Sequence, residues 1–471
     1  MIFKRKAIGY VRIIATATVC LSLVALALGV GVQTLLLPAT RTVAISNGQL
    51  GRILVAGPPG EPLSFVIVLS DTSGITSDVS SLSSAMVAKG AAVVTLSTPQ
   101  LLATLDAHAT TGCHYALGLF EDISQAGQRA LNRHTYTPPV IVGLGEGGAL
   151  AYVSAAQAPP NTVAGAVSVG FTPILKTRIP FCAGASFGAS ADGFHYNPVA
   201  AMAGRWVEIA TGEGDAVARA FAAAGSYGEI REGGSGRSGR FTVAVDSAFE
   251  ISRIATASAD QMPVKEMPSA GADTLMIFYS GDGGWRDIDM RIAKFLNRHG
   301  VAVLGIDSFR YLWTEKSSAE IGSDLDRLVA SYRKRWNIRH VALAGYSMGA
   351  GILPFAWARA SDETRSSINL IAMLSLDPQA SFQVSAAGFL GLATPTDVDI
   401  GPAAKGLPHE RVVCFYGADE HRPEDSGCLV PEMQGATLIE RPGGHHFDGN
   451  YEPIAQIILQ RLNGGSPLRG L

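Results

Sequence analysis

The sequence predicts an α/β fold arranged as two tandem domains, each with a doubly wound, mainly parallel sheet. Apolar strand-like runs alternate with helical segments, which is the pattern of parallel βαβ units. The chain also repeats itself, because LSFVIVLSDTSG from Leu63 aligns with DTLMIFYSGDGG from Asp273, and Ser70 falls on Ser280. Its length of 471 residues is too great for one ordinary hydrophobic core and suggests two or three domains.

An apolar segment precedes the repeats. Basic residues between Lys4 and Arg12 are followed by the uncharged run from Ile13 to Leu37. As a helix, at about 1.5 Å per residue, this run would cover roughly 37 Å, more than the ~30 Å hydrocarbon core and more than a usual signal peptide provides. We therefore expect residues 1–40 to form an uncleaved inner-membrane anchor with the rest in the periplasm, a long cleaved signal peptide being the alternative. Cys20, inside the run, is expected to be a membrane-buried apolar residue.

The domain boundaries follow from composition. We expect the first domain at residues 41–258 and the second at residues 271–471. Between them, residues 256–270 contain two prolines and no long apolar run. The segment REGGSGRSGR, residues 231–240, is predicted to be a flexible surface loop of the first domain because it is rich in glycine and serine.

Charge and cysteines restrict the class of protein. A net charge of −3 leaves no basic stripe, so nucleic acid is not an expected partner. Cys113 and Cys182 lie in the first half, and Cys414 and Cys428 in the second. In an exported protein an even count per domain favours the disulfides Cys113–Cys182 and Cys414–Cys428. The chain has no HExxH and no CxxC motif, so neither a metal ion nor a cofactor is expected.

A strand-turn-helix motif supplies the expected nucleophile. The apolar run VALA, from Val341, breaks into Gly345-Tyr346-Ser347-Met348-Gly349 and continues as helix-forming ILPFAWARA. This is the pattern of the nucleophile elbow in α/β-hydrolases, where flanking glycines permit a tight turn that exposes the serine at the edge of the sheet. Ser186 lies in a similar Gly-x-Ser-x-Gly match, but no strand precedes it. We therefore predict that Ser347 is the nucleophile.

Serine needs a base, and in this fold the acid and then the histidine follow the serine along the chain. His445 and His446 lie in RPGGHHFDGNY, between the apolar strand GATLIE and the last helix. That loop is where the fold carries its base. We predict His445 as the base, with His446 as the alternative.

The acid should follow the preceding strand, RVVCFYG, which runs into Ala418-Asp419-Glu420. The expected spacing after Gly417 favours Glu420, with Asp419 as a close rival. Asp377, at the end of another strand, is a weaker third candidate. A Cys414–Cys428 disulfide would bracket this loop and hold the acid in position.

An oxyanion hole requires two backbone amides. Met348, directly after the serine, supplies one, and the loop SGDGGW from Ser280 supplies the other through Asp282. The first domain lacks the corresponding catalytic residues. Its segment PPVIVGLGEGG aligns with the elbow segment, but Gly145 stands at the position of Ser347. Its neighbour Glu146 aligns with Met348, and its side chain is expected to point away. We predict a degenerate first domain that is retained for binding or scaffolding.

Together the N-terminal anchor, the serine-less first half, GYSMGA, SGDGGW, the paired-cysteine acid loop and GGHHFDGNY resemble the bacterial virulence protein family called VirJ and AcvB, in its longer AcvB-like form. The resemblance implies a periplasmic serine hydrolase that converts lysyl-phosphatidylglycerol of the inner membrane into phosphatidylglycerol and lysine. In that reaction Ser347 would attack the ester carbonyl and His445 would take its proton. The alternatives are another periplasmic serine esterase or lipase, and a non-catalytic periplasmic factor whose partners are type IV secretion components.

Overall fold

The computed structural model describes residues 40–464 apart from five internal stretches of two residues or more and three single positions. The residues left out between those ends are 110–111, 183, 201, 211–214, 226–227, 235, 257–261 and 386–396. The predicted anchor helix, from Ile13 to Leu37, lies outside the described residues. Within the described part, no helix combines the length and the apolar character needed to cross a bilayer.

The N-terminal half contains an eight-stranded sheet in the order β1-β2-β4-β3-β5-β6-β10-β11. Its first two pairings are antiparallel and the others are parallel. The strands are β1 Arg41–Asn47, β2 Gly51–Gly57, β3 Ser64–Leu69, β4 Ala91–Leu96, β5 Val140–Leu144, β6 Gly165–Val169, β10 Arg205–Ala210 and β11 Gly228–Glu232. A small antiparallel sheet is formed by β7 Ile174–Leu175, β9 Gly193–Tyr196 and β8 Phe187–Ser190.

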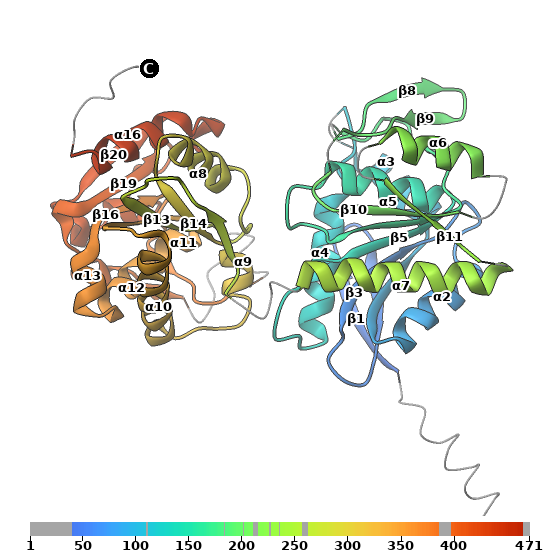
Figure 1. Cartoon of the computed structure of the whole chain (residues 1–471), viewed down its shortest axis with the longest axis horizontal. Coiled ribbons are helices and arrows are strands. Elements are labelled where there is room, and N and C mark those ends of the chain that lie inside the picture. The colour runs from blue at the N-terminus through green and yellow to red at the C-terminus, as the bar shows by residue number, and fades with distance from the viewer. Residues whose placement is uncertain are drawn as a thin grey trace, which may run out of the picture.

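Helices cover both faces of this sheet (Figure 1). They are α2 Ser77–Ala88, α3 Thr98–Ala107, α4 Leu117–Ala130, α5 Glu146–Gln157, α6 Ala216–Ala224 and α7 Gly236–Thr256. Successive strand residues are buried on opposite faces: Ile67 packs with α3 to α6, whereas Val66 and Val68 pack with α2 and α7. Strands covered on both faces read as continuous apolar runs, which is why the repeats are visible in the sequence.

The C-terminal half contains a seven-stranded sheet in the order β12-β14-β13-β15-β16-β19-β20, in which β12 is antiparallel and every other pairing is parallel. The strands are β12 Val264–Met267, β13 Thr274–Tyr279, β14 Ala302–Ile306, β15 His340–Tyr346, β16 Ile368–Leu374, β19 Val412–Gly417 and β20 Thr437–Arg441. A separate pair is β17 Gln379–Ala380 with β18 Val398–Asp399. The exchange of β13 and β14 in this order matches that of β3 and β4 in the N-terminal half.

Two layers of helices enclose this second sheet as well. The helices are α8 Ile288–Arg298, α9 Ser308–Tyr311, α10 Ser318–Trp336, α11 Met348–Gly351, α12 Leu353–Arg359, α13 Asp362–Ser367, α15 Gly401–Ala404 and α16 Glu452–Leu462. Short 3-10 turns are η2 His409–Arg411, η3 Gly427–Leu429, η4 Pro431–Met433 and η5 Phe447–Gly449. Phe278 of β13 packs with α8 and α16, whereas Ile277 packs with α10 and α12. The two halves therefore have separate cores.

The two halves meet through α4 on one side and the segments after β13 and β14 on the other (Figure 1). The indole Nε1 of Trp313 donates to the carbonyl oxygen of Arg133 at 2.9 Å, and the guanidinium of Arg129 stacks over the Trp313 ring at 3.9 Å. Tyr136 is buried in the core of the C-terminal half, against Phe309 and Trp313. These contacts are apolar at the centre and hold α4 and the residues after it against the segment that follows β14.

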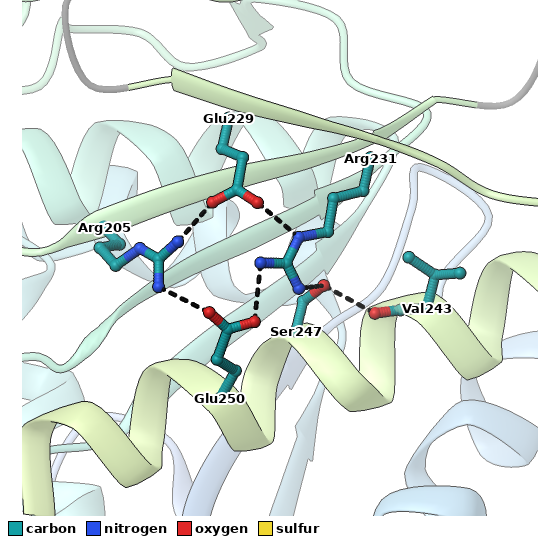
Figure 2. A network of polar contacts seen from close by, with 6 residues as sticks. All are labelled: Arg205, Glu229, Arg231, Val243, Ser247 and Glu250. Atoms are coloured by element: carbon teal, nitrogen blue, oxygen red, sulfur yellow. Dashed lines mark hydrogen bonds and ion pairs between the residues drawn. The ribbon is translucent and has the colours of Figure 1, made fainter. Parts of the chain in front are cut away.

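The prediction of a flexible loop at residues 231–240 is wrong. The segment contains the end of β11 and the first turns of α7. Figure 2 shows the reason: Arg205 of β10, Glu229 and Arg231 of β11, and Glu250 of α7 form a closed ring of ion pairs. Glu229 and Arg231 are two residues apart on one strand and so share a face. The ring joins the edge strand β11 to α7, because the sequence of β11 contains no apolar run that could form this contact.

Replacing Glu250 with glutamine is expected to lower the free energy of unfolding by about 0.5 to 1 kcal/mol at pH 7, because two ion pairs of a partly exposed network are lost. Arg231 and Arg205 hold the pKa of Glu250 below its usual value. This stabilisation is therefore present above the unfolded-state pKa, about 4.3, and is lost as the pH falls through the folded-state pKa. Urea unfolding at pH 7 and pH 3 measures the loss of stability and its disappearance at low pH. Glu410→Gln, which removes the carboxylate of an exposed ion pair, serves as the control.

Candidate active site

The serine predicted as the nucleophile lies on a strained turn between β15 and α11. Ser347 has φ 50° and ψ −120°, a conformation that costs energy for any residue with a Cβ atom. A Cβ atom on Gly345 would come within 2.4 Å of the Gly349 carbonyl oxygen, and one on Gly349 within 2.3 Å of the Ser280 carbonyl oxygen. Both glycines are therefore required by close backbone approach. The turn is held by a 2.9 Å hydrogen bond from the Ser347 amide to the Leu374 carbonyl oxygen.

The structure places Glu420, and not Asp419, against His445. Oε1 of Glu420 lies 3.1 Å from Nδ1 of His445, and its other oxygen accepts from the Gly417 amide at 3.2 Å. The carbonyl oxygen of His445 accepts a hydrogen bond from Ser375 Oγ at 2.8 Å, which fixes the loop. Asp419 is exposed. The two carboxylates are adjacent in sequence, so only the turn after β19 decides which of them faces the imidazole.

The electrostatic environment of His445 is acidic. Burial on its own would lower the pKa of His445, but its hydrogen bond to the Glu420 carboxylate and the nearby carboxylates of Asp377 and Asp282 raise that pKa above its ordinary value. Burial raises the pKa of Asp377 and of Asp282, and in both cases the neighbouring His445 opposes that rise. Asp377, the weaker acid candidate, thus lies near the histidine without bonding to it.

The other candidates lie elsewhere. His446 Nδ1 is 2.7 Å from the hydroxyl of Tyr346, so this ring faces the residue before the serine. Ser186 precedes the exposed strand β8, and its Oγ accepts from the Asn197 side chain at 3.0 Å. Its surroundings do not form a strand-turn-helix elbow. Among the described residues, no three His, Cys, Asp or Glu side chains are grouped in a way that would hold a metal ion.

Both predicted disulfides are confirmed. Cys113 is bonded to Cys182 in the N-terminal half, and Cys414 to Cys428 in the C-terminal half. Cys414 lies in β19 and Cys428 in the turn η3, so the bond closes the segment that carries Glu420. Constraining that segment limits the number of arrangements the acid loop can adopt.

The loop after β13 lies beside the serine. A Cβ atom on Gly281 would be 3.7 Å from the Cβ atom of Ser347. The Asp282 carboxylate is close enough to His445 for each to shift the pKa of the other. Met348, at the first position of α11, presents its amide at the same edge of the sheet. The predicted oxyanion donors, Asp282 and Met348, therefore belong to two segments that meet at the nucleophile.

The N-terminal half retains this arrangement in a blocked form. Gly145 has φ 52° and ψ −116°, almost the same backbone conformation as Ser347. Oδ1 of Asp71 accepts hydrogen bonds from the amide of Thr72 at 2.7 Å and from the amide of Glu146 at 3.1 Å. In the repeat alignment these amides correspond to those of Asp282 and Met348. The Asp71 carboxylate thus occupies the place of an oxyanion.

A steric clash in this blocked site explains the missing serine. A Cβ atom on Gly145 would lie 2.2 Å from Oδ1 of Asp71, so the carboxylate and a serine exclude each other. The Glu146 side chain points away from the amides and accepts from the Lys176 amide at 3.0 Å, as expected for this position. Sequence reasoning missed Asp71, although the signal was present: Asp71 aligns with Gly281, the residue that leaves the corresponding space open in the C-terminal half.

Comparisons with solved structures give three representative matches. They are MenH from S. aureus (12% identity, 44% of this chain and 99% of that chain, TM-score 0.33), a dienelactone hydrolase from Anabaena variabilis (18%, 42% and 88%, 0.30) and Est1E from Butyrivibrio proteoclasticus (15%, 42% and 93%, 0.30). Each match covers less than half of this chain. The assignment of an α/β-hydrolase fold rests on the chain's own strand order and elbow.

No curated protein matches the chain. Residues 273–465 match the profile of the family described as "VirJ: Bacterial virulence protein (VirJ)". This range contains the elbow, the acid loop and the histidine loop described above, so the family resemblance predicted from those motifs is confirmed. The C-terminal half of this chain therefore carries the similarity to the VirJ family.

Proposed function

We propose that the protein is a periplasmic serine hydrolase that cleaves the aminoacyl ester of lysyl-phosphatidylglycerol, giving phosphatidylglycerol and lysine. In this proposal residues 271–471 form the catalytic α/β-hydrolase domain and residues 41–258 a degenerate copy. The observation that carries it is the 3.1 Å pairing of Glu420 with His445 at the sheet edge that also bears the strained Ser347. The disulfides favour an oxidising compartment.

The proposed reaction proceeds in two halves. Ser347 Oγ attacks the lysyl carbonyl carbon while His445 takes the hydroxyl proton, and Glu420 stabilises the imidazolium. The amides of Met348 and Asp282 bind the tetrahedral oxyanion. His445 then gives its proton to the glycerol oxygen, which leaves as phosphatidylglycerol. Water, deprotonated by His445, attacks the lysyl-enzyme ester, and lysine departs as Ser347 recovers its proton.

The acidic surroundings of His445 support a cationic substrate. A lysyl ester carries two ammonium groups, whereas most esters carry none. Burial disfavours the ionised forms of Asp377 and Asp282, so a bound ammonium would stabilise both carboxylates and be stabilised by them. An acidic pocket would also repel the phosphate of the headgroup, which would leave the lysyl end nearest the serine.

Replacing Asp377 with asparagine is expected to raise KM for lysyl-phosphatidylglycerol about tenfold, because one charge-assisted contact to an ammonium group is lost. Hydrolysis of an uncharged ester such as p-nitrophenyl acetate should be little affected. Steady-state kinetics on both substrates measure the difference. Asp419→Asn provides the matched control, since Asp419 is an exposed carboxylate in the same region. Equal losses on both esters would contradict a role in cation recognition.

The pH dependence of kcat/KM is expected to follow the protonation of His445. Activity needs the neutral imidazole, so kcat/KM is expected to rise with pH through the pKa of His445, which lies above the ordinary 6.5. Glu420→Gln removes one of the carboxylates that raise this pKa. The surviving activity of that variant should therefore reach its plateau at lower pH than in the wild type, a shift that a pH–rate profile measures directly.

The function is tested by the phospholipid profile of cells that lack the protein, complemented with the wild type or with Ser347→Ala. We expect lysyl-phosphatidylglycerol to accumulate, and only the wild type to correct it. An unchanged profile in cells that make this lipid would exclude it as the substrate and favour another ester. Correction by Ser347→Ala would instead favour a non-catalytic role, such as an association with type IV secretion components.

A further inference from the structure

An ion pair connects the N-terminal half to the loop beside the nucleophile. Arg286, directly after the SGDGGW motif, places Nη1 3.1 Å and 3.2 Å from the two carboxylate oxygens of Glu121 on α4. The guanidinium also lies against the backbone of the motif, since a Cβ atom on Gly283 would be 3.3 Å from Arg286 Nε. One side chain thus touches both the first half and the segment that contains Asp282.

The pair is largely removed from solvent. The side chains of Arg286 and Glu121 are 24% and 16% exposed. Burial raises the pKa of Glu121, and Arg286 opposes that rise without cancelling it. Burying both charges costs desolvation energy, so a pair of this kind contributes little net stability and is better explained by the geometry it fixes.

The neighbouring contacts show which geometry is fixed. A small cavity of about 20 Å³ at this junction is lined from the first half by Glu121 and Tyr136, and from the second by Gly283, Gly284 and Arg286. Gly284 has φ +79°, so the loop depends on a backbone conformation that few residues support. The first half therefore forms the outer wall of the loop whose inner side faces Ser347.

We propose that the N-terminal half positions the oxyanion loop of the C-terminal half, and that Glu121 is the positioning residue, acting through Arg286. This inference rests on the proposed hydrolase function. Without the carboxylate, the guanidinium loses its partner across the junction and the backbone from Asp282 to Gly284 gains freedom. An amide that must meet an oxyanion at hydrogen-bonding distance then spends less time in the productive position.

The interface itself should survive loss of this pair. Trp313 is held by the Arg133 carbonyl oxygen and by Arg129, and Tyr136 is buried against Phe309, all independently of Glu121. The variant Glu121→Gln in the full chain is therefore expected to keep the two halves together. It isolates the effect on the loop from dissociation of the halves.

The experiment compares Glu121→Gln with Asp122→Asn, a matched change at the adjacent, exposed carboxylate of α4. With p-nitrophenyl acetate, we expect kcat to fall about 10- to 100-fold in Glu121→Gln with KM unchanged, and neither to change in Asp122→Asn. Arg286→Gln should give a similar loss, and the double variant Glu121→Gln/Arg286→Gln should be no worse than Arg286→Gln alone.

Hydrogen exchange of the amides at residues 281–286 provides a readout that does not depend on activity. Faster exchange of these amides in Glu121→Gln, with unchanged exchange in α4 and in Asp122→Asn, is the expected result. Unchanged exchange in Glu121→Gln would overturn the inference. If the wild type hydrolyses no ester, the proposed function fails, and the exchange measurement alone decides whether Glu121 positions the loop.

Discussion

Replacing Gly281 with aspartate is expected to lower kcat/KM at least 10³-fold while leaving the fold intact. The N-terminal half already shows the result of this change, because Asp71 stands at the corresponding position and its carboxylate binds both oxyanion amides. Loss of one oxyanion donor typically costs about 10²- to 10³-fold. In Gly281→Asp the carboxylate would also compete with Ser347 for space, as the Asp71 carboxylate would with a Cβ atom on Gly145. Ester hydrolysis by the purified full chain measures the effect.

The control for this prediction is Gly281→Ala. A Cβ atom at this position would lie 3.0 Å from the Tyr346 ring, so both variants require the same small adjustment of that side chain. Only the aspartate adds a carboxylate. If alanine and aspartate reduce kcat/KM equally, crowding against Tyr346 explains the loss, and the analogy with Asp71 is wrong.

Replacing His445 with alanine is expected to reduce kcat about 10⁴- to 10⁶-fold, because an elbow serine without its base is a poor nucleophile. His446→Ala should reduce it less than tenfold, since that ring bonds to the Tyr346 hydroxyl and not to the acid. Active-site labelling with a fluorophosphonate measures the same difference without a choice of ester. Equal losses in both variants would contradict the assignment of His445 as the base.

The parts of the site that the sequence predicts well are those encoded locally. The elbow around Ser347 is visible because a tight strand-to-helix turn requires glycines at fixed spacing. The Cys414–Cys428 disulfide follows from an even cysteine count in each half of a chain that the sequence predicts to be exported. The sequence distinguishes less clearly between Glu420 and Asp419 as the acid. Adjacent side chains in the turn after β19 point in different directions, and the local composition does not determine the conformation of that turn.

The parts that sequence reasoning missed depend on contacts between distant segments. Glu121 and Arg286 are each ordinary surface-type residues in sequence, and only the packing of α4 against the second half brings them together. The same limit explains the wrong prediction at residues 231–240. Its glycines and charges are typical of a loop, yet Arg231 is held by carboxylates from β11 and α7. Asp71 is intermediate, because the repeat alignment marks it as unusual but does not show which amides it meets.

The carboxylate of Asp71 is chemically similar to the product of the proposed reaction. Hydrolysis of an ester releases a carboxylic acid, so Asp71 resembles a tethered product of the proposed reaction. It is bound by the two amides of the N-terminal half that correspond to those of Asp282 and Met348. Tethering gives this group an effective concentration that no freely diffusing acid reaches, which keeps the amides of the N-terminal half occupied. An amino acid released in the proposed reaction would have no such attachment. The same hydrogen-bonding geometry therefore holds a permanent ligand in the N-terminal half, whereas the proposed reaction requires it to release its ligand in the C-terminal half.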